Sequence, residues 1–190
     1  MRDVEARGPN FVYARDYLLA RIGERQWDDL VSSLPPEHKD VWTRRLLVTG
    51  VYPFSSFKAM LAALADFEGS KPAHETAKMY EYIAEQSLST VHKFFFRLAD
   101  PAFVIKRYPL LWTRFFNAGK VQVPHSVRGQ AGLIFDVPNI FLDWLYPACL
   151  GYSSKAVEVS GGRNVALAET SRESTGSDDS RVGYRLTWER

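Results

Sequence analysis

The segment Ser87–Gly119, SLSTVHKFFFRLADPAFVIKRYPLLWTRFFNAG, gathers eight aromatic side chains within a stretch long enough for about two helices. Asp100-Pro101 predicts a helix N-cap followed by proline in the first turn, and Asn117-Ala118-Gly119 is typical of a helix end. The rings therefore come together either as the middle of a core or as the wall of an apolar pocket. The residues alone leave both interpretations open.

Before this segment the apolar residues recur three and four positions apart, which predicts amphipathic helices. The first covers residues 11–21 and ends before Gly23, and the second ends at Pro35-Pro36, where neither ring can donate a backbone hydrogen bond. Further helices are expected after Pro36 and from Ser55 or Ser56 to Ala65, and a long one from about His74 to Leu98.

After Gly119 the apolar period changes to two, which is typical of strands. Lys120–Val127 and Gly129–Val137 predict a hairpin that turns at Arg128-Gly129. A helix is expected at about residues 139–151, stopped by Gly151. Three later strands are predicted at Ala156–Val159, Val165–Ala168 and Val182–Trp188.

Helices followed by strands indicate an α+β fold, with the helices packed on one side of a twisted antiparallel sheet. We expect a single domain over residues 1–190. Residues 1–118 form its mainly helical part, and residues 119–190 hold the antiparallel strands and the one helix at about 139–151.

The composition indicates a folded protein, because 46% of the 190 residues are hydrophobic and 14% are aromatic. The net charge of +2 arises from 24 basic and 22 acidic residues, so no overall field favours nucleic acid. One cysteine, Cys149, excludes an intramolecular disulfide. The charged N-terminus does not resemble a signal peptide, so none is expected, and no apolar run has the length of a membrane span. These features predict a cytoplasmic protein.

No catalytic signature is visible in the sequence. The four histidines, of which His92 lies in the aromatic segment, are far apart, and one cysteine cannot build a zinc site. Nucleophile elbows, phosphate loops and dinucleotide fingerprints are missing from the sequence. We therefore predict a protein that is not an enzyme and has no metal site or cofactor.

Two residues allow alternative interpretations. His92 could be a haem ligand or a polar contact in an apolar pocket, or a histidine at the rim of a packed face. Cys149 could be a reactive or acylated thiol, or a small buried hydrophobic residue. The basic residues among the aromatic ones could belong to a nucleic-acid-binding surface, on which bases stack on the aromatic rings, or could form the solvent-exposed side of a core helix.

Asp100-Pro101, the run Tyr108–Trp112 and the closing Val182–Trp188 resemble a bacterial family of proteins of about this length. That family is grouped with the 4-vinyl-reductase domain, the haem-nitric-oxide-binding domain and the TRAPP transport subunits. The resemblance covers nearly the whole chain. It implies helices and a twisted antiparallel sheet around an apolar pocket, often in a homodimer, in a haem-NO-binding/TRAPP-like fold.

The chain departs from these relatives at their functional residues. Haem-binding relatives carry Tyr-x-Ser-x-Arg, whereas the nearest string here, Tyr152–Ala156, lacks the arginine. Vinyl-reductase relatives carry cysteines in the last hairpin, and Glu169–Gly183 has none. The resemblance therefore implies neither bound haem nor that metal site here.

The first hypothesis is a non-enzymatic sensory or regulatory domain that binds a small apolar ligand in an aromatic-lined pocket and changes a dimer or partner surface. The second is an adaptor without ligand that uses the same fold to bind a protein, as the transport subunits bind a small GTPase. A third, nucleic-acid binding, would need a basic face that the charge balance does not predict. The predicted ligand-binding residues are His92, Phe96, Trp112, Phe116 and Trp144.

Overall fold

The computed structural model describes residues 4–89 and 100–189. The helices are α1 (Gly8–Ser33), α2 (Pro36–Thr43), α3 (Phe54–Glu68), α4 (Pro72–Ser89), α6 (Pro101–Lys106), α7 (Tyr108–Phe115), the 3-10 turn η1 (Asn139–Phe141) and α8 (Leu142–Val159). The strands are β1 (Glu5–Arg7), β2 (Val51–Pro53), β3 (Lys120–Val127), β4 (Gln130–Pro138), β5 (Arg163–Ser174) and β6 (Asp179–Glu189).

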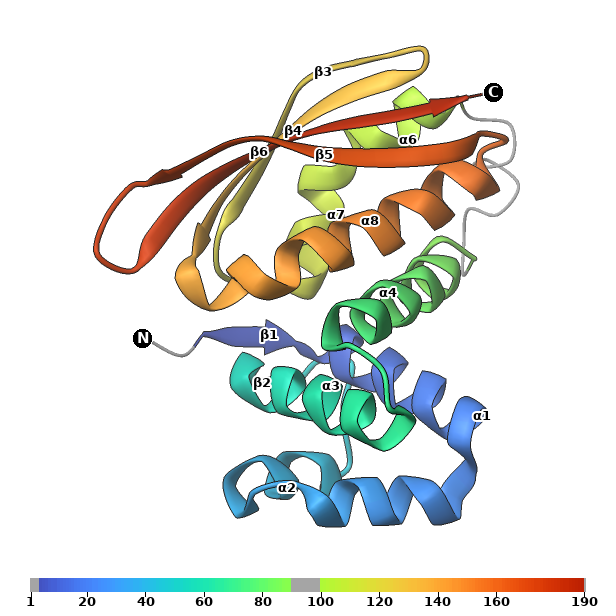
Figure 1. Ribbon diagram of the computed structural model, residues 1–190, viewed down its shortest axis with the longest axis vertical. Helices are drawn as coiled ribbons and strands as arrows, with labels where there is room; N and C mark the ends of the chain where they lie inside the picture. The colour runs from blue at the N-terminus through green and yellow to red at the C-terminus, as the bar shows by residue number, and fades with distance from the viewer. Residues whose placement is uncertain (1–3, 90–99, 190) are drawn as a thin grey trace.

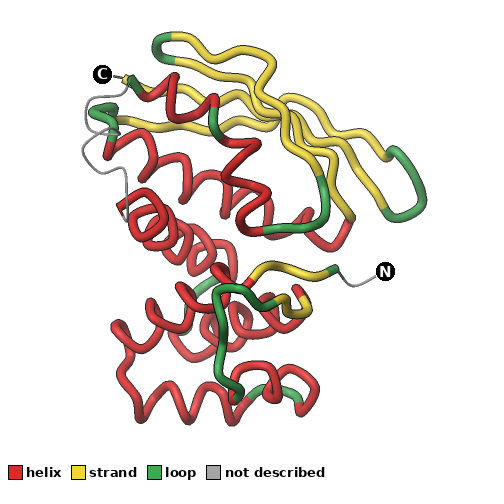
Figure 2. The backbone as a smooth tube through the Cα atoms, turned by 180° about the vertical axis from the view of Figure 1, so that it is seen from behind, coloured by secondary structure: helices red, strands yellow, loops and turns green. Residues whose placement is uncertain are grey.

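Four strands form one antiparallel sheet in the order β3-β4-β6-β5, and β1 pairs with β2 in a separate short ladder. Figure 1 shows α7 and α8 beneath this sheet, with α6 drawn behind the strands, and Figure 2 shows the same arrangement from behind. The register pairs Val121 with Phe135 and Leu133 with Tyr184, and all four side chains are buried. The predicted α+β class, with helices against a twisted antiparallel sheet, is confirmed.

Helices α1, α2 and α3 form a second group below, and α4 lies between that group and α8 (Figure 1). The backbones of α4 and α8 approach very closely at Gly151. A Cβ atom added there would lie 2.1 Å from the carbonyl oxygen of Ala77. Glycine at this position therefore allows the two helices to cross.

The same contact explains an error in the sequence-based prediction. Gly151 was expected to end a helix at about residues 139–151, but α8 continues through it to Val159. The strand predicted at Ala156–Val159 is therefore wrong, because this glycine serves helix packing and does not terminate the helix. The chain turns after Val159 and enters β5 at Arg163.

Other local features of the backbone follow from the sequence. Gly23 interrupts α1 with a φ of 77°, a value that favours glycine. Helix α7 ends at Phe115, shortly before the predicted Asn117-Ala118-Gly119, and Gly119 has a φ of 76° in the connection to β3. The Asp100 side chain accepts a hydrogen bond of 2.9 Å from the backbone N–H of Ala102, as an N-cap should. The predicted helix from His74 to Leu98 begins at Pro72 in α4, and its last residues lie outside the described part of the chain.

A buried carboxylate ties α1 to α4. The Glu75 side chain is 1% exposed and accepts hydrogen bonds from Arg21 and from Ser70 Oγ. Arg21 also pairs with Glu68 at 3.1 Å. Burial raises the pKa of Glu75, but the hydrogen bonds from Arg21 and Ser70 outweigh burial and the pKa is lowered.

Replacing Glu75 with glutamine is expected to lower the free energy of unfolding at neutral pH by about 2 kcal/mol, because a charge-assisted hydrogen bond is lost. A lowered folded-state pKa gives stability that is present above the unfolded value near 4.5 and is lost as the pH falls through the folded value. The difference in Tm between wild type and Glu75→Gln should therefore shrink in acid. Thermal melts across this pH range measure it, with the exposed Glu81→Gln as the control. A difference that does not change with pH would contradict this role.

Candidate functional site

The core between α3, α7 and α8 is a cluster of stacked and edge-to-face rings. Trp112 and Phe116 lie 4.4 Å apart between ring centroids, and Phe54 and Phe141 lie 4.5 Å apart. Trp144 contacts Phe116 at 5.1 Å. Such spacings are those of favourable aromatic pairs, so the rings fix each other's positions.

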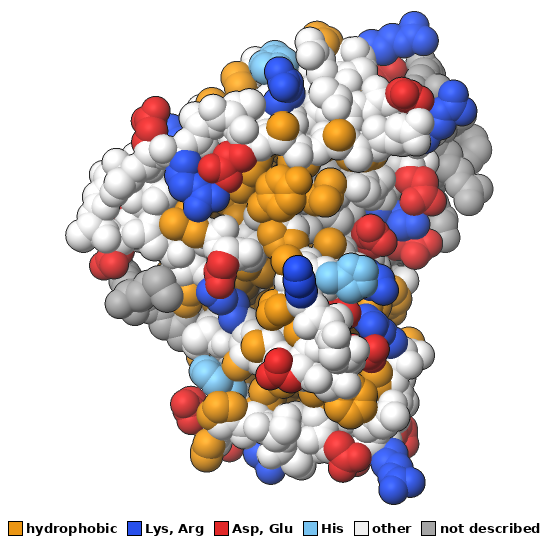
Figure 3. Space-filling view, in the orientation of Figure 1, with side chains coloured by type: hydrophobic (Ala, Val, Ile, Leu, Met, Phe, Trp, Pro, Cys, Tyr) orange, Lys and Arg blue, Asp and Glu red, His pale blue; other side chains and the backbone are white. Residues whose placement is uncertain are grey.

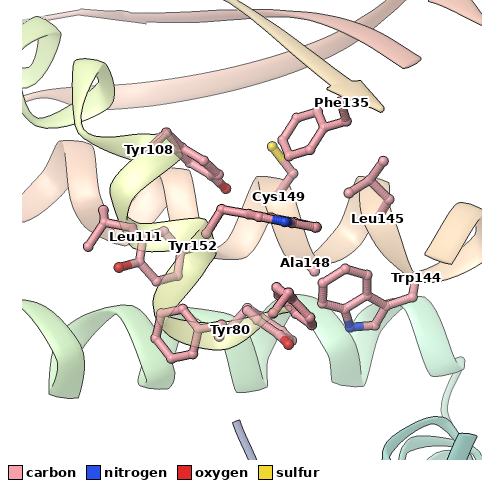
Figure 4. A pocket seen from close by; sticks show the side chains of 12 residues that line it. Tyr80, Tyr108, Leu111, Phe135, Trp144, Leu145, Ala148, Cys149 and Tyr152 are labelled. Carbon is pink, nitrogen blue, oxygen red and sulfur yellow. The ribbon is translucent and has the colours of Figure 1, made fainter. Parts of the chain in front are cut away.

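An internal cavity of about 30 Å³ lies within this aromatic cluster. It has room for about one or two water-sized molecules. Every lining residue is buried. Figure 4 shows the lining side chains, which come from α4, α7, β4 and α8 and from Phe116: Tyr80, Tyr108, Leu111, Trp112, Phe115, Phe116, Phe135, Trp144, Leu145, Ala148, Cys149 and Tyr152.

A thiol and a phenol lie on the sheet side of the cavity. In Figure 4 the sulfur of Cys149 points toward Phe135, near the hydroxyl of Tyr108. Burial raises the pKa of Cys149 to about 11, against the opposing effect of Tyr108 and Ser153. A thiol that stays protonated at neutral pH is a poor nucleophile, which favours the interpretation of Cys149 as a small buried hydrophobic residue.

Two further tyrosines bring hydroxyl groups to the cavity wall, and both already have partners. Tyr152 and Ser87 share a hydrogen bond of 3.0 Å, and burial raises the pKa of Tyr152 to about 12. Tyr80 donates to Asn10 Oδ1 at 2.9 Å, and Asn10 in turn donates to the Phe115 carbonyl at 2.7 Å. The site therefore has neutral, paired polar groups in an apolar setting.

The indole N–H of Trp144, unlike the hydroxyls of Tyr80 and Tyr152, has no hydrogen-bond partner in the part of the chain that the structure describes. Among the described residues, it and the Tyr184 hydroxyl are the buried side-chain polar atoms with no hydrogen-bond partner. Burial raises the pKa of Tyr80 well above its ordinary value, and the neighbouring Trp144 N–H opposes that rise. The two groups nevertheless do not have the geometry of a hydrogen bond.

Three of the five predicted ligand-binding residues, Trp112, Phe116 and Trp144, line this one cavity. The other two, His92 and Phe96, lie outside the described residues. That these side chains bind a ligand stays a prediction. The prediction missed Tyr80, Phe135 and the small residues of α8, because their approach depends on helix and strand packing over long sequence separations.

No family model and no curated protein matches the sequence. Solved structures of H-NOX proteins match the fold over nearly the full length. The Fe(II) unliganded H-NOX protein from K. algicida shares 13% identity, with a TM-score of 0.69 over 97% of each chain. A mutant H-NOX protein from S. oneidensis in the Fe(II) ligation state shares 12%, with a TM-score of 0.73 over 97% of this chain and 96% of that one. A mutant H-NOX structure from T. Tengcongensis shares 11%, with a TM-score of 0.70 over 97% of this chain and 98% of that one.

The chain therefore has an α+β fold of the H-NOX type, in which helices pack against a four-stranded antiparallel sheet. At these identities the similarity establishes the fold and not the ligand.

The cavity does not fit haem. Ligand pockets for molecules of drug size enclose about 300–1,000 Å³, about ten times the 30 Å³ found here or more. Haem could enter only if several rings such as Trp112, Phe116 and Trp144 were displaced. No histidine lines the cavity among the described residues, and within the same residues no group of three or more His, Cys, Asp or Glu side chains could hold a metal ion.

None of the described helices combines the length and the apolar character that crossing a bilayer requires.

Proposed function

We propose that this protein is a non-enzymatic sensory or regulatory domain, of the bacterial family that the sequence resembles, that binds a small apolar ligand inside its aromatic cluster. The observation that carries this proposal is the apolar cavity at the centre of the fold, lined by Trp112, Phe116 and Trp144. The H-NOX fold supports it, since the solved relatives are named for their Fe(II) and NO ligation states. The occupant here is a molecule other than haem.

The dimensions and chemistry of the cavity define its ligand class. About 30 Å³ admits a molecule of a few atoms, and a larger one only if side chains rearrange. The lining offers apolar rings, a protonated thiol and hydroxyl groups that are already paired, so a charged ligand would be desolvated without compensation. A gas-sized or small neutral apolar molecule therefore fits best. Its binding would change the packing of the ring cluster, and this change would be transmitted to a second copy of the protein or to another protein.

One observation favours the adaptor as a second function. Leu47, Val48 and Val51 are 48%, 59% and 49% exposed, and they lie close together in the sequence before and within β2. Neighbouring exposed apolar residues are typical of a protein contact. A small GTPase remains the partner that the resemblance implies.

Xenon is a suitable probe, because it is apolar and small. Dissolved xenon is expected to shift the indole and methyl NMR signals of the cavity lining in the wild-type protein. Ala148→Val should lose these shifts, because the added methyl groups of a cavity-lining alanine fill the space. Ala156→Val is the matched control, since Ala156 is an equally buried alanine of α8 that does not line the cavity. Shifts that survive in Ala148→Val, or that vanish in both variants, would contradict this site.

A further inference from the structure

A second hollow, the outer pocket, lies against the cavity wall. Its volume is about 150 Å³. It is lined by residues from α3, the start of α4 and the start of α8: Lys58, Leu61, Ala62, Pro72, Ala73, Thr76, Asp143 and Trp144. An apolar cavity of about 150 Å³ is large enough for one benzene ring.

Of the described residues, only Trp144 lines both the outer pocket and the inner cavity. Its indole ring therefore separates the two spaces. The residue is 4% exposed, and Figure 4 shows it at one end of the ring cluster.

The charges of the outer pocket are already paired. Lys58 Nζ donates to Asp143 Oδ1 at 2.7 Å and to the Ile140 carbonyl at 3.1 Å. Thr76 Oγ1 donates to the Pro72 carbonyl at 2.8 Å. A charged ligand would have to break the pair of Lys58 with Asp143, so the pocket favours an uncharged one. On the face of the molecule that Figure 3 draws, apolar side chains gather across the middle, with charged side chains at their edges.

One donor in the lining lacks a partner. The Trp144 N–H is buried and has no acceptor within the described part of the chain. The nearby Tyr80 hydroxyl donates its own proton to Asn10 Oδ1. A buried donor without an acceptor is unfavourable, so a ligand oxygen placed here would be bound selectively.

We propose that the outer pocket binds a small uncharged aromatic molecule with one acceptor oxygen, which accepts a hydrogen bond from Trp144 Nε1. This inference goes beyond the proposed function, because it assigns a second site, on the other side of Trp144, with its own class of ligand.

Acetophenone and cumene are the probes, because they have similar shapes and only acetophenone carries an acceptor oxygen. With the ¹⁵N-labelled full chain, acetophenone should move the Trp144 indole N–H signal, which the Trp144→Phe variant assigns. Cumene should leave the signal without the downfield shift of a new hydrogen bond. The ratio of the two Kd values should favour acetophenone about 10-fold more in the wild type than in Trp144→Phe.

A pair of alanine substitutions tests the location. Ala73 is exposed at the start of α4, so Ala73→Leu should fill the outer pocket without disturbing the core and weaken acetophenone binding at least about 10-fold. Ala63→Leu is the matched control, since Ala63 lies on α3 and lines a different groove. It should bind acetophenone as the wild type does.

The inference is overturned if acetophenone does not bind up to its solubility limit, if the Trp144 signal does not move at saturation, or if Ala73→Leu binds normally. The xenon measurement separates this failure from failure of the proposed function. Xenon in the inner cavity with no acetophenone at Trp144 leaves the proposed function standing. If neither xenon nor acetophenone binds, both proposals are contradicted.

Discussion

Replacing Gly151 with alanine is expected to lower the free energy of unfolding by about 3 kcal/mol, which corresponds to a fall in Tm of roughly 6–12 °C. The added methyl group would lie 2.1 Å from the oxygen, 2.8 Å from the carbonyl carbon and 3.0 Å from the Cα of Ala77. All three are backbone atoms of α4, so no side chain can move aside. The helices would have to separate along the contact that holds the two halves of the fold together.

The sign of this effect distinguishes packing from helix propensity. Inside a helix with free space, glycine to alanine stabilises by about 1 kcal/mol. Gly176→Ala is the control, because a Cβ atom there meets nothing within 4 Å. It should change stability by less than about 0.5 kcal/mol. Urea unfolding of both variants measures the difference, and a Gly151→Ala protein as stable as the wild type would disprove the close crossing.

Replacing Trp112 with alanine is expected to cost about 4 kcal/mol, since a large buried ring is removed and a cavity is left. The indole contacts Phe116 at 4.4 Å and Phe135 at 5.5 Å, and its N–H donates to the Ala118 carbonyl at 3.0 Å. Leu110→Ala on the same helix is the control, because Leu110 is 60% exposed and should cost little.

The enlarged cavity of Trp112→Ala provides a second measurement. Free indole should bind there and raise the Tm of the variant, while leaving the Tm of the wild type unchanged. If the protein has the proposed function, the folded variant should also lose the ligand that the wild type binds, because binding would depend on the shape of the ring cluster. A folded Trp112→Ala protein that retains its ligand with unchanged affinity would place the binding site elsewhere.

Local sequence signals predicted those parts of the fold that depend on backbone chemistry. Asp100 caps a helix, Gly23 breaks one, and the two-residue period after Gly119 gives the strands of the sheet. Gly151 shows the limit of such signals. A glycine that ends a helix and one that admits a neighbouring backbone look the same in a sequence, and only the position of Ala77 distinguishes them.

The candidate site was predictable only in part, because local sequence signals indicate some of its residues and long-range packing brings in the others. The density of rings around Trp112 and Phe116 in the sequence predicted a shared apolar environment. Trp144 was predicted to join them because it lies in a helix rich in apolar residues. Tyr80 and Phe135 carry no comparable signal. Tyr80 reaches the cavity because α4 packs along α8, and Phe135 because the sheet that contains β4 lies over that helix (Figure 1). Both contacts join residues that are far apart in the sequence.

Native mass spectrometry of the freshly purified protein, compared with its denatured mass, tests most directly whether a small ligand occupies the aromatic cavity. We expect a non-covalent mass excess in the wild type and in Ala156→Val, and none in Ala148→Val. The same spectrum would show whether two copies associate. A native mass equal to a whole number of bare chains in the wild type would contradict ligand binding and favour the adaptor.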